Sequence, residues 1–274
     1  MRKQKAILTT THVDSHFEKM SLSALESIVD LINRCHSPFV VEHDPRIPPI
    51  GRVLDARIKQ LEDGEYGVEA TIEVYEQGEE IPLIDDSKEI PLHNHRADKL
   101  EIRYDRNFRT VDDQLLIRDL ASLFGTEPKE EIKKALDPLT VLTICGAFLL
   151  GGIAKGFLSK IGGDGYDLLK DRLKKLMGRK KSGEKEKLLS FQFTIQQGDY
   201  TMETELILTN PTDDDIERVL ANGLEQMDLL LPKYCNPATG IKKVVFEYSE
   251  GAVKFTYGIR KDAVPLMEEH PEGN

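Results

Sequence analysis

The sequence predicts an α+β protein with a β-rich N-terminal domain and flanking helices, a glycine-rich apolar helix in the middle, and a C-terminal ββαββ domain. Residues that alternate between apolar and polar, as half-buried strands do, occur near both ends of the chain. A helical apolar face separates the C-terminal strands, and residues 138–154 contain no charge. Since 274 residues exceed the common size of one domain, we place domains at residues 1–112, 113–181 and 188–267.

The first part is expected to contain one helix and several strands. Ser23 and Glu26 have the spacing of a capping box before an apolar face, which predicts a helix over residues 22–34. Residues 66–74 alternate strictly and are expected to pair with residues 51–60 in a hairpin. Because alternating strands need one buried face, we expect a barrel-like sheet with the helix packed on it.

A long, charged stretch at residues 76–99 is expected to be a surface loop, and a further strand follows it around Ile102. The loop contains His93 and His95, whose spacing would place both rings on one face of a strand. No acidic or cysteine partner stands at a recognised motif spacing from them. We therefore interpret both as solvated loop residues and predict no metal site and no cofactor.

After two helical patterns between residues 113 and 136, residues 138–154 form a 17-residue uncharged run. As a helix it would span about 26 Å, less than the roughly 30 Å of a bilayer's hydrocarbon core. One interpretation is a membrane-associating or oligomerising helix, and the other is a buried helix that packs between the two domains. In both, small residues let helices approach closely, and the candidates are Gly146, Gly151, Gly152 and Gly156.

A basic segment follows the apolar run. Residues 155–187 hold 11 Lys or Arg against five acids, whereas the whole chain has a net charge of -11. Basic segments of this kind are typical of proteins that bind an anionic membrane surface. The residues expected to contribute are Lys170, Arg172, Lys174, Lys175, Arg179 and Lys180.

The C-terminal domain is expected to have the order strand, strand, helix, strand, strand. Two alternating runs at residues 188–196 and 202–210 precede Thr212, which is placed to cap a helix with a continuous apolar face. Two more alternating runs, at residues 242–249 and 253–260, predict a second pair of strands. One helix on a small sheet is an α+β arrangement.

Two stretches, THVDSHFEKMSLSAL and PFVVEHDPRIPPIGRVLDARIKQLEDGEYGVEATIEV, resemble the N-terminal half of phage prohead (capsid maturation) proteases, serine peptidases related to herpesvirus assemblin. The matching positions are Asp14, His43, Asp44, Gly51, Arg52 and Val53. The resemblance covers residues 5–110 and implies a small closed β-barrel with flanking helices. It also implies that a histidine activates a serine on a later strand, but Glu101 stands at the matching position here. We therefore interpret His43 and Glu101 as remnants of a catalytic site.

Composition narrows the function further. The acidic chain lacks Trp, so we do not expect nucleic acid as a partner. Three cysteines without paired spacing, and no apolar secretory signal, indicate a cytoplasmic protein. The membrane interpretation of the apolar run would place it peripheral to or inserted in the inner membrane, whereas the buried interpretation would not. We expect a non-enzymatic interaction protein in phage-related or antiphage biology that self-associates and binds a protein through its C-terminal domain. The alternative is a serine peptidase of the assemblin type that uses His43.

Overall fold

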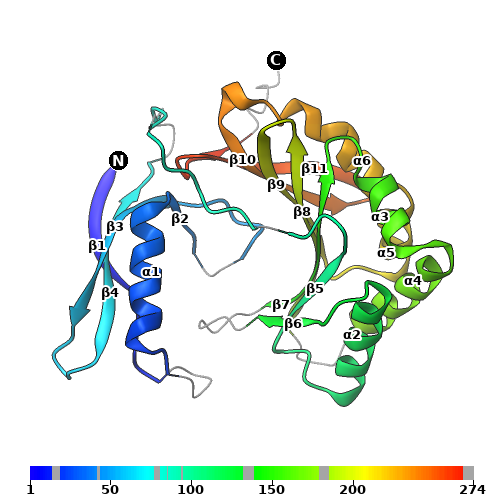
Figure 1. The fold of residues 1–274 in the computed structure, drawn as a ribbon, viewed down its shortest axis with the longest axis horizontal. Helices are drawn as coiled ribbons and strands as arrows, with labels where there is room; N and C mark the ends of the chain where they lie inside the picture. Colours follow the sequence, from blue (N-terminus) through cyan, green and yellow to red (C-terminus); the bar gives the residue numbers. More distant parts are fainter. Residues whose placement is uncertain are drawn as a thin grey trace. The chain divides into compact units, whose positions relative to one another are not determined.

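The computed structural model describes residues 1–13, 19–41, 44–76, 81–84, 86–93, 95–131, 139–178 and 185–267 (Figure 1). The described residues within Met1–Pro91 and Ile259–Leu266 form a smaller compact unit. Those within Leu92–Lys133 and Asp137–Gly258, together with Met267, form a larger one. Each unit contains strands and helices, so the predicted mixed α+β class is confirmed.

The smaller unit is a four-stranded antiparallel sheet with one helix packed against it. The strands lie in the order β1 (Arg2–Thr10), β4 (Tyr66–Val74), β3 (Gly51–Gln60) and β2 (Ser37–Phe39), and the helix is α1 (Leu22–Arg34). The helix and sheet share an apolar core of Leu25, Ile32, Val53, Ala56, Val68 and Ala70. The expected helix and β3–β4 hairpin are confirmed, but the N-terminal cap of α1 is Ser21 rather than Ser23.

This sheet is open within the described residues, so the closed barrel is not confirmed. The strand order ends at β1 on one side and at β2 on the other. Closing a sheet into a barrel requires its two edge strands to pair, and β1 and β2 do not pair with each other here. The three-residue strand β2 also leaves most of β3 without a neighbour on that side.

The motif Gly51-Arg52-Val53 has a packing role in this sheet. A Cβ atom on Gly51 would overlap with the backbone carbonyl of Glu73 on the neighbouring strand. The buried guanidinium of Arg52 pairs with the Glu73 carboxylate at 2.7 Å, and Val53 belongs to the core. The structure therefore explains these three residues by strand packing.

Replacing Gly51 by alanine is expected to lower the free energy of unfolding by about 1–3 kcal/mol, because strand β4 must move to admit the methyl group. Urea unfolding followed by circular dichroism measures this difference. Gly163→Ala is the matched control, since no atom lies within 4 Å of the added Cβ there. If the Gly51→Ala variant were as stable as the wild type, strands β3 and β4 would be able to move apart without loss of free energy of unfolding, which would contradict the prediction.

The C-terminal segment Ile259–Leu266 belongs to the smaller unit. It turns back on itself through a hydrogen bond from the Arg260 amide to the Val264 carbonyl at 2.9 Å and ends in the short strand β12 (Pro265–Leu266). Asp262 within it is fully buried. Its carboxylate pairs with Arg260 at 2.8 Å and with Arg52 at 3.4 Å. Residues from the two ends of the chain are thus joined by ion pairs in one unit.

The larger unit has a mixed sheet with helices on one face (Figure 1). Its strands lie in the order β11 (Ala252–Arg260), β10 (Ile241–Ser249), β9 (Tyr200–Thr209), β8 (Glu186–Gln197), β7 (Leu139–Leu149), β5 (Glu101–Asp105) and β6 (Lys129–Glu131). The α-helices are α2 (Val111–Leu123), α3 (Ile153–Ile161), α4 (Gly163–Met177), α5 (Asp213–Arg218) and α6 (Leu224–Leu230). A π-helical turn, Val219–Gly223, joins the last two, and short 3₁₀ turns follow at Leu231–Lys233 and Pro237–Thr239.

The apolar run is a strand, so the expectation of a glycine-rich apolar helix is wrong. Residues Leu139–Leu149 form β7, which lies between β5 and β8. Nearly every residue of this strand is buried, on both faces of the sheet. Such a strand lacks polar alternation, which makes it indistinguishable from a buried helix by pattern alone. No described helix has the length and apolarity required to cross a membrane.

The C-terminal order of strands and helix is confirmed. Thr212 caps α5 in a capping box with Asp215. The predicted apolar helix face is buried, and it consists of Ile216, Val219, Leu220, Leu224, Met227 and Leu231. These elements are not a separate domain, because β7 pairs with β8 in parallel over eleven residue pairs. The larger unit therefore combines most of what we placed in two domains, at 113–181 and 188–267.

Candidate functional site

One face of the larger sheet carries a buried polar network. Phe191 and Phe193 of β8 contact Phe157 of α3. Because side chains alternate along a strand, the residues before, between and after these two phenylalanines point to the opposite face. The polar side chains that this alternation brings to the opposite face are Ser190, Gln192 and Thr194 of β8, Glu203 and Glu205 of β9, and Lys243 of β10. Most of them are buried, so they must satisfy one another.

Lys243 lies between the two glutamates of this network. Its Nζ is 2.9 Å from Glu203 Oε1 and 2.7 Å from Glu205 Oε2. Ser190 donates to Glu205 at 2.8 Å, and Gln192 donates to Glu203 at 2.8 Å. Burial opposes ionisation of Glu203, but Lys243 and His93 outweigh it, so the pKa of Glu203 lies well below its usual value. The two carboxylates and the one ammonium of Lys243 give these three side chains one excess negative charge.

His93 is held by Glu203. Its Nδ1 is 2.7 Å from Glu203 Oε2, and its backbone amide donates to the same oxygen at 3.2 Å. Thr194 donates to the His93 carbonyl at 2.7 Å, which fixes the loop on the sheet. The His93 side chain remains 48% exposed. It is thus an anchored ring with one edge open to solvent.

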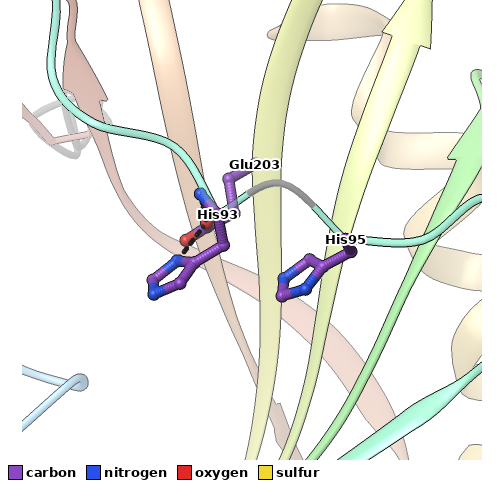
Figure 2. A group of neighbouring side chains, drawn as sticks. All are labelled: His93, His95 and Glu203. Atoms are coloured by element: carbon purple, nitrogen blue, oxygen red, sulfur yellow. Dashed lines mark hydrogen bonds and ion pairs between the residues drawn. The ribbon is translucent and has the colours of Figure 1, made fainter.

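His95 lies beside His93 with its ring parallel, at an interplanar angle of 4° and a centroid distance of 5.6 Å (Figure 2). Only 6% of His95 is exposed, so its interpretation as a solvated loop residue is wrong. Its Nδ1 is 3.4 Å from Arg103, and its buried Nε2 has no hydrogen-bond partner among the described residues. Burial and the Arg103 charge lower the pKa of His95 to about 4, so the ring is neutral at pH 7.

Together, His93, His95 and Glu203 form a set of possible metal ligands. One donor atom from each lies within 4.8 Å of the other two (Figure 2). Two imidazole nitrogens and one carboxylate oxygen are a donor set that Zn²⁺ and neighbouring transition metals accept. A tetrahedral ion with bonds of about 2.0–2.2 Å holds its ligand atoms about 3.3 Å apart. The two rings would have to close slightly around an ion, and the half-exposed His93 ring has space to move.

Glu101, which the sequence resemblance predicted to be a remnant of a catalytic site, lies on β5 and is buried. Its carboxylate is 2.8 Å from Lys129 Nζ. Burial opposes ionisation of Glu101, but Lys129 outweighs it, so the pKa lies below the usual value. Asp14 and His43 lie outside the described residues.

Two of the four predicted glycine sites, Gly146 and Gly156, are packed closely within the chain. A Cβ on Gly146 would lie 2.8 Å from Leu100, and one on Gly156 would lie 2.7 Å from the Phe148 ring. Gly152 caps α3, whereas Gly151 adopts a left-handed backbone conformation with φ of 73° and open space around it. Close packing within the chain therefore accounts for Gly146 and Gly156.

The basic residues of α4 are paired with acids of the same chain. Lys170 pairs with Asp167, Arg172 with Asp119 and Asp171, Lys174 with Glu217, and Lys175 with Asp171. Arg179 and Lys180 lie outside the described residues. Binding of this segment to an anionic surface stays a prediction, and it would have to compete with these ion pairs.

The sequence pattern missed Glu203 as the acidic partner of the histidines, because it is 110 residues away from His93. The available signal was the alternation of β8 and β9, in which glutamate, glutamine and serine take every second position.

No protein-family model, curated protein or solved structure matches this chain.

Proposed function

We propose that this is a non-enzymatic binding protein whose larger unit takes up a divalent transition-metal ion through His93, His95 and Glu203. The observation that carries the proposal is the buried Nε2 of His95, which has no partner among the described residues and lies beside the His93–Glu203 pair. A buried nitrogen without a partner is costly unless something else binds it. A metal ion would satisfy it.

The local charge supports a cation at this position. Glu203 and Glu205 carry two negative charges against the single ammonium of Lys243, while His95 is neutral. Arg103 opposes a cation, but it already contacts Glu131 at 3.4 Å. A metal on His95 Nε2 would place the ring proton on Nδ1, so Arg103 would turn from His95 toward Glu131.

The ion pair between Glu101 and Lys129 supports a non-enzymatic role for the region that resembles a peptidase. A carboxylate held by an ammonium at 2.8 Å supplies no acyl-transfer nucleophile. The matching residues Gly51 and Arg52 have packing contacts that need no catalysis to explain them. Self-association and a protein partner stay part of this proposal as the sequence predicted them.

The metal-free protein is expected to bind one Zn²⁺ per chain in equilibrium dialysis and calorimetry. His93→Gln and His95→Gln should each weaken the binding at least tenfold, because each removes one of three ligands. Cobalt(II) absorption spectra of the same proteins report whether nitrogen ligands surround the ion.

His12→Gln is the matched control for this experiment. His12 is exposed, pairs with Asp63 at 2.6 Å and belongs to the smaller unit, so its loss should leave the affinity unchanged. The absence of saturable Zn²⁺ binding by the wild type would refute the proposal. Equal weakening by His12→Gln would do the same, because it would show adventitious binding to surface histidines.

A further inference from the structure

A cavity of about 520 Å³ lies in the larger unit where the end of β7 meets α3. Strand β5 pairs with β7 only as far as Cys145, so no described strand lies beside the last residues of β7 on that side. Ala147 and Phe148 of β7 line it, together with Gly156 of α3. A side chain at Gly156 would meet the Phe148 ring, so the glycine keeps this ring against the helix.

Lys160 of α3 supplies the charge of this cavity. It is the only Lys, Arg, Asp or Glu among the described residues that line the space. Its Nζ donates one hydrogen bond to the Ala147 carbonyl at 2.9 Å and lies 4.1 Å from the centre of the Phe148 ring. Burial lowers the pKa of Lys160, and the charge of Asp98 offsets this only in part. An ammonium has three donors, so Lys160 can bind a further acceptor.

The remaining polar groups of the cavity are uncharged. Thr194, Gln196 and Thr201 contribute hydroxyl and amide groups from strands β8 and β9. His95 lines the same space, and its buried Nε2 lacks a partner among the described residues. A mostly apolar cavity with a few converging polar groups is the usual form of a small-molecule site.

We propose that this cavity binds a small organic anion, with a carboxylate or phosphate group on Lys160 and a flat apolar body against Phe148. The charge-assisted hydrogen bond to the ammonium selects the anion, since none of the described residues that line the space is an acid. The aromatic ring favours a flat ligand because stacked or edge-on rings attract. This inference does not rest on the proposed metal ion, because Lys160 supplies the charge.

The experiment uses three probes of one shape: 2-naphthoate, 2-naphthyl phosphate and the neutral 2-naphthamide. They are titrated into the full chain in the presence of EDTA, and binding is followed by calorimetry and by NMR shifts. At least one anion should bind at least tenfold more tightly than the amide, and the preferred anion identifies carboxylate or phosphate as the ligand class. Because EDTA removes metal, failure of the metal proposal leaves this result unaffected.

Lys160→Gln should weaken binding of the preferred anion at least tenfold while changing binding of 2-naphthamide less than twofold. Lys155→Gln is the matched control, because Lys155 lies on the same helix, is exposed and does not line the cavity. Ala147→Leu should block all three probes by filling the space. The proposal is overturned if neither anion binds more tightly than the amide, if Lys155→Gln is equally harmful, or if Ala147→Leu has no effect in a folded protein.

Discussion

Replacing Lys243 by methionine is expected to lower the free energy of unfolding by about 3–5 kcal/mol, because two buried carboxylates lose the ammonium between them. Methionine is unbranched and keeps most of the apolar stem of lysine, so the change removes mainly the ammonium group. Ser190 and Gln192 still donate to the two glutamates, but neutral donors compensate a buried negative charge only partly. Urea unfolding of the purified variant measures the loss.

Two comparisons separate this effect from loss of the lysine stem. Lys254→Met removes an exposed lysine that pairs with Glu250 at 3.1 Å, and it should cost no more than about 1 kcal/mol. Adding Glu205→Gln to Lys243→Met removes one of the two unpaired charges and should recover part of the lost stability. If the single variant is as stable as Lys254→Met, the network contributes little to folding.

The sequence predicted the elements whose signals are local. The helix at 22–34 and the hairpin of β3 and β4 follow from periodicity over about ten residues, and Thr212 caps α5 because its side chain bonds to nearby amides. The prediction of a helix for the residues of β7 was wrong, because burial on both faces removes the alternation that identifies a strand. The domain division failed to anticipate that β7 and β8, on either side of a charged segment, pair in one sheet.

The candidate site depended on contacts that no short pattern contains. The spacing of His93 and His95 was visible, but its meaning depends on Glu203, which sheet pairing brings close from 110 residues away. Burial of His95 likewise results from the packing of a loop that is polar in sequence. The sequence also marked Glu101 as a catalytic remnant, which stays a prediction, and its pairing with Lys129 depends on the parallel strands β5 and β6.

Replacing Asp262 by alanine is expected to destabilise the smaller unit by about 3–5 kcal/mol. This fully buried carboxylate contacts the guanidinium groups of Arg52 and Arg260 and accepts a hydrogen bond from the Ile84 amide at 3.1 Å. Among the described residues, Arg52 would then keep only Glu73 as an ionic partner, and Arg260 would keep only backbone carbonyl acceptors. Asp262→Asn should cost less, because the amide oxygen can still accept.

The same residue gives the unit a pH dependence with a defined sign. Burial opposes ionisation of Asp262, but Arg260 and Arg52 outweigh it, so its pKa lies below the usual value of 3.8. The unfolded chain therefore binds this proton more readily, and the stabilisation is complete above about pH 4 and declines as the pH falls below that. Asp262→Ala should lack this component of the acid transition.

Hydrogen exchange provides the local test. The Ile84 amide donates to the Asp262 carboxylate and the Ile90 amide donates to the Lys261 carbonyl, so both amides should exchange faster in the variant. Unchanged protection of both amides would mean that other contacts hold the segment Ile259–Leu266 in place.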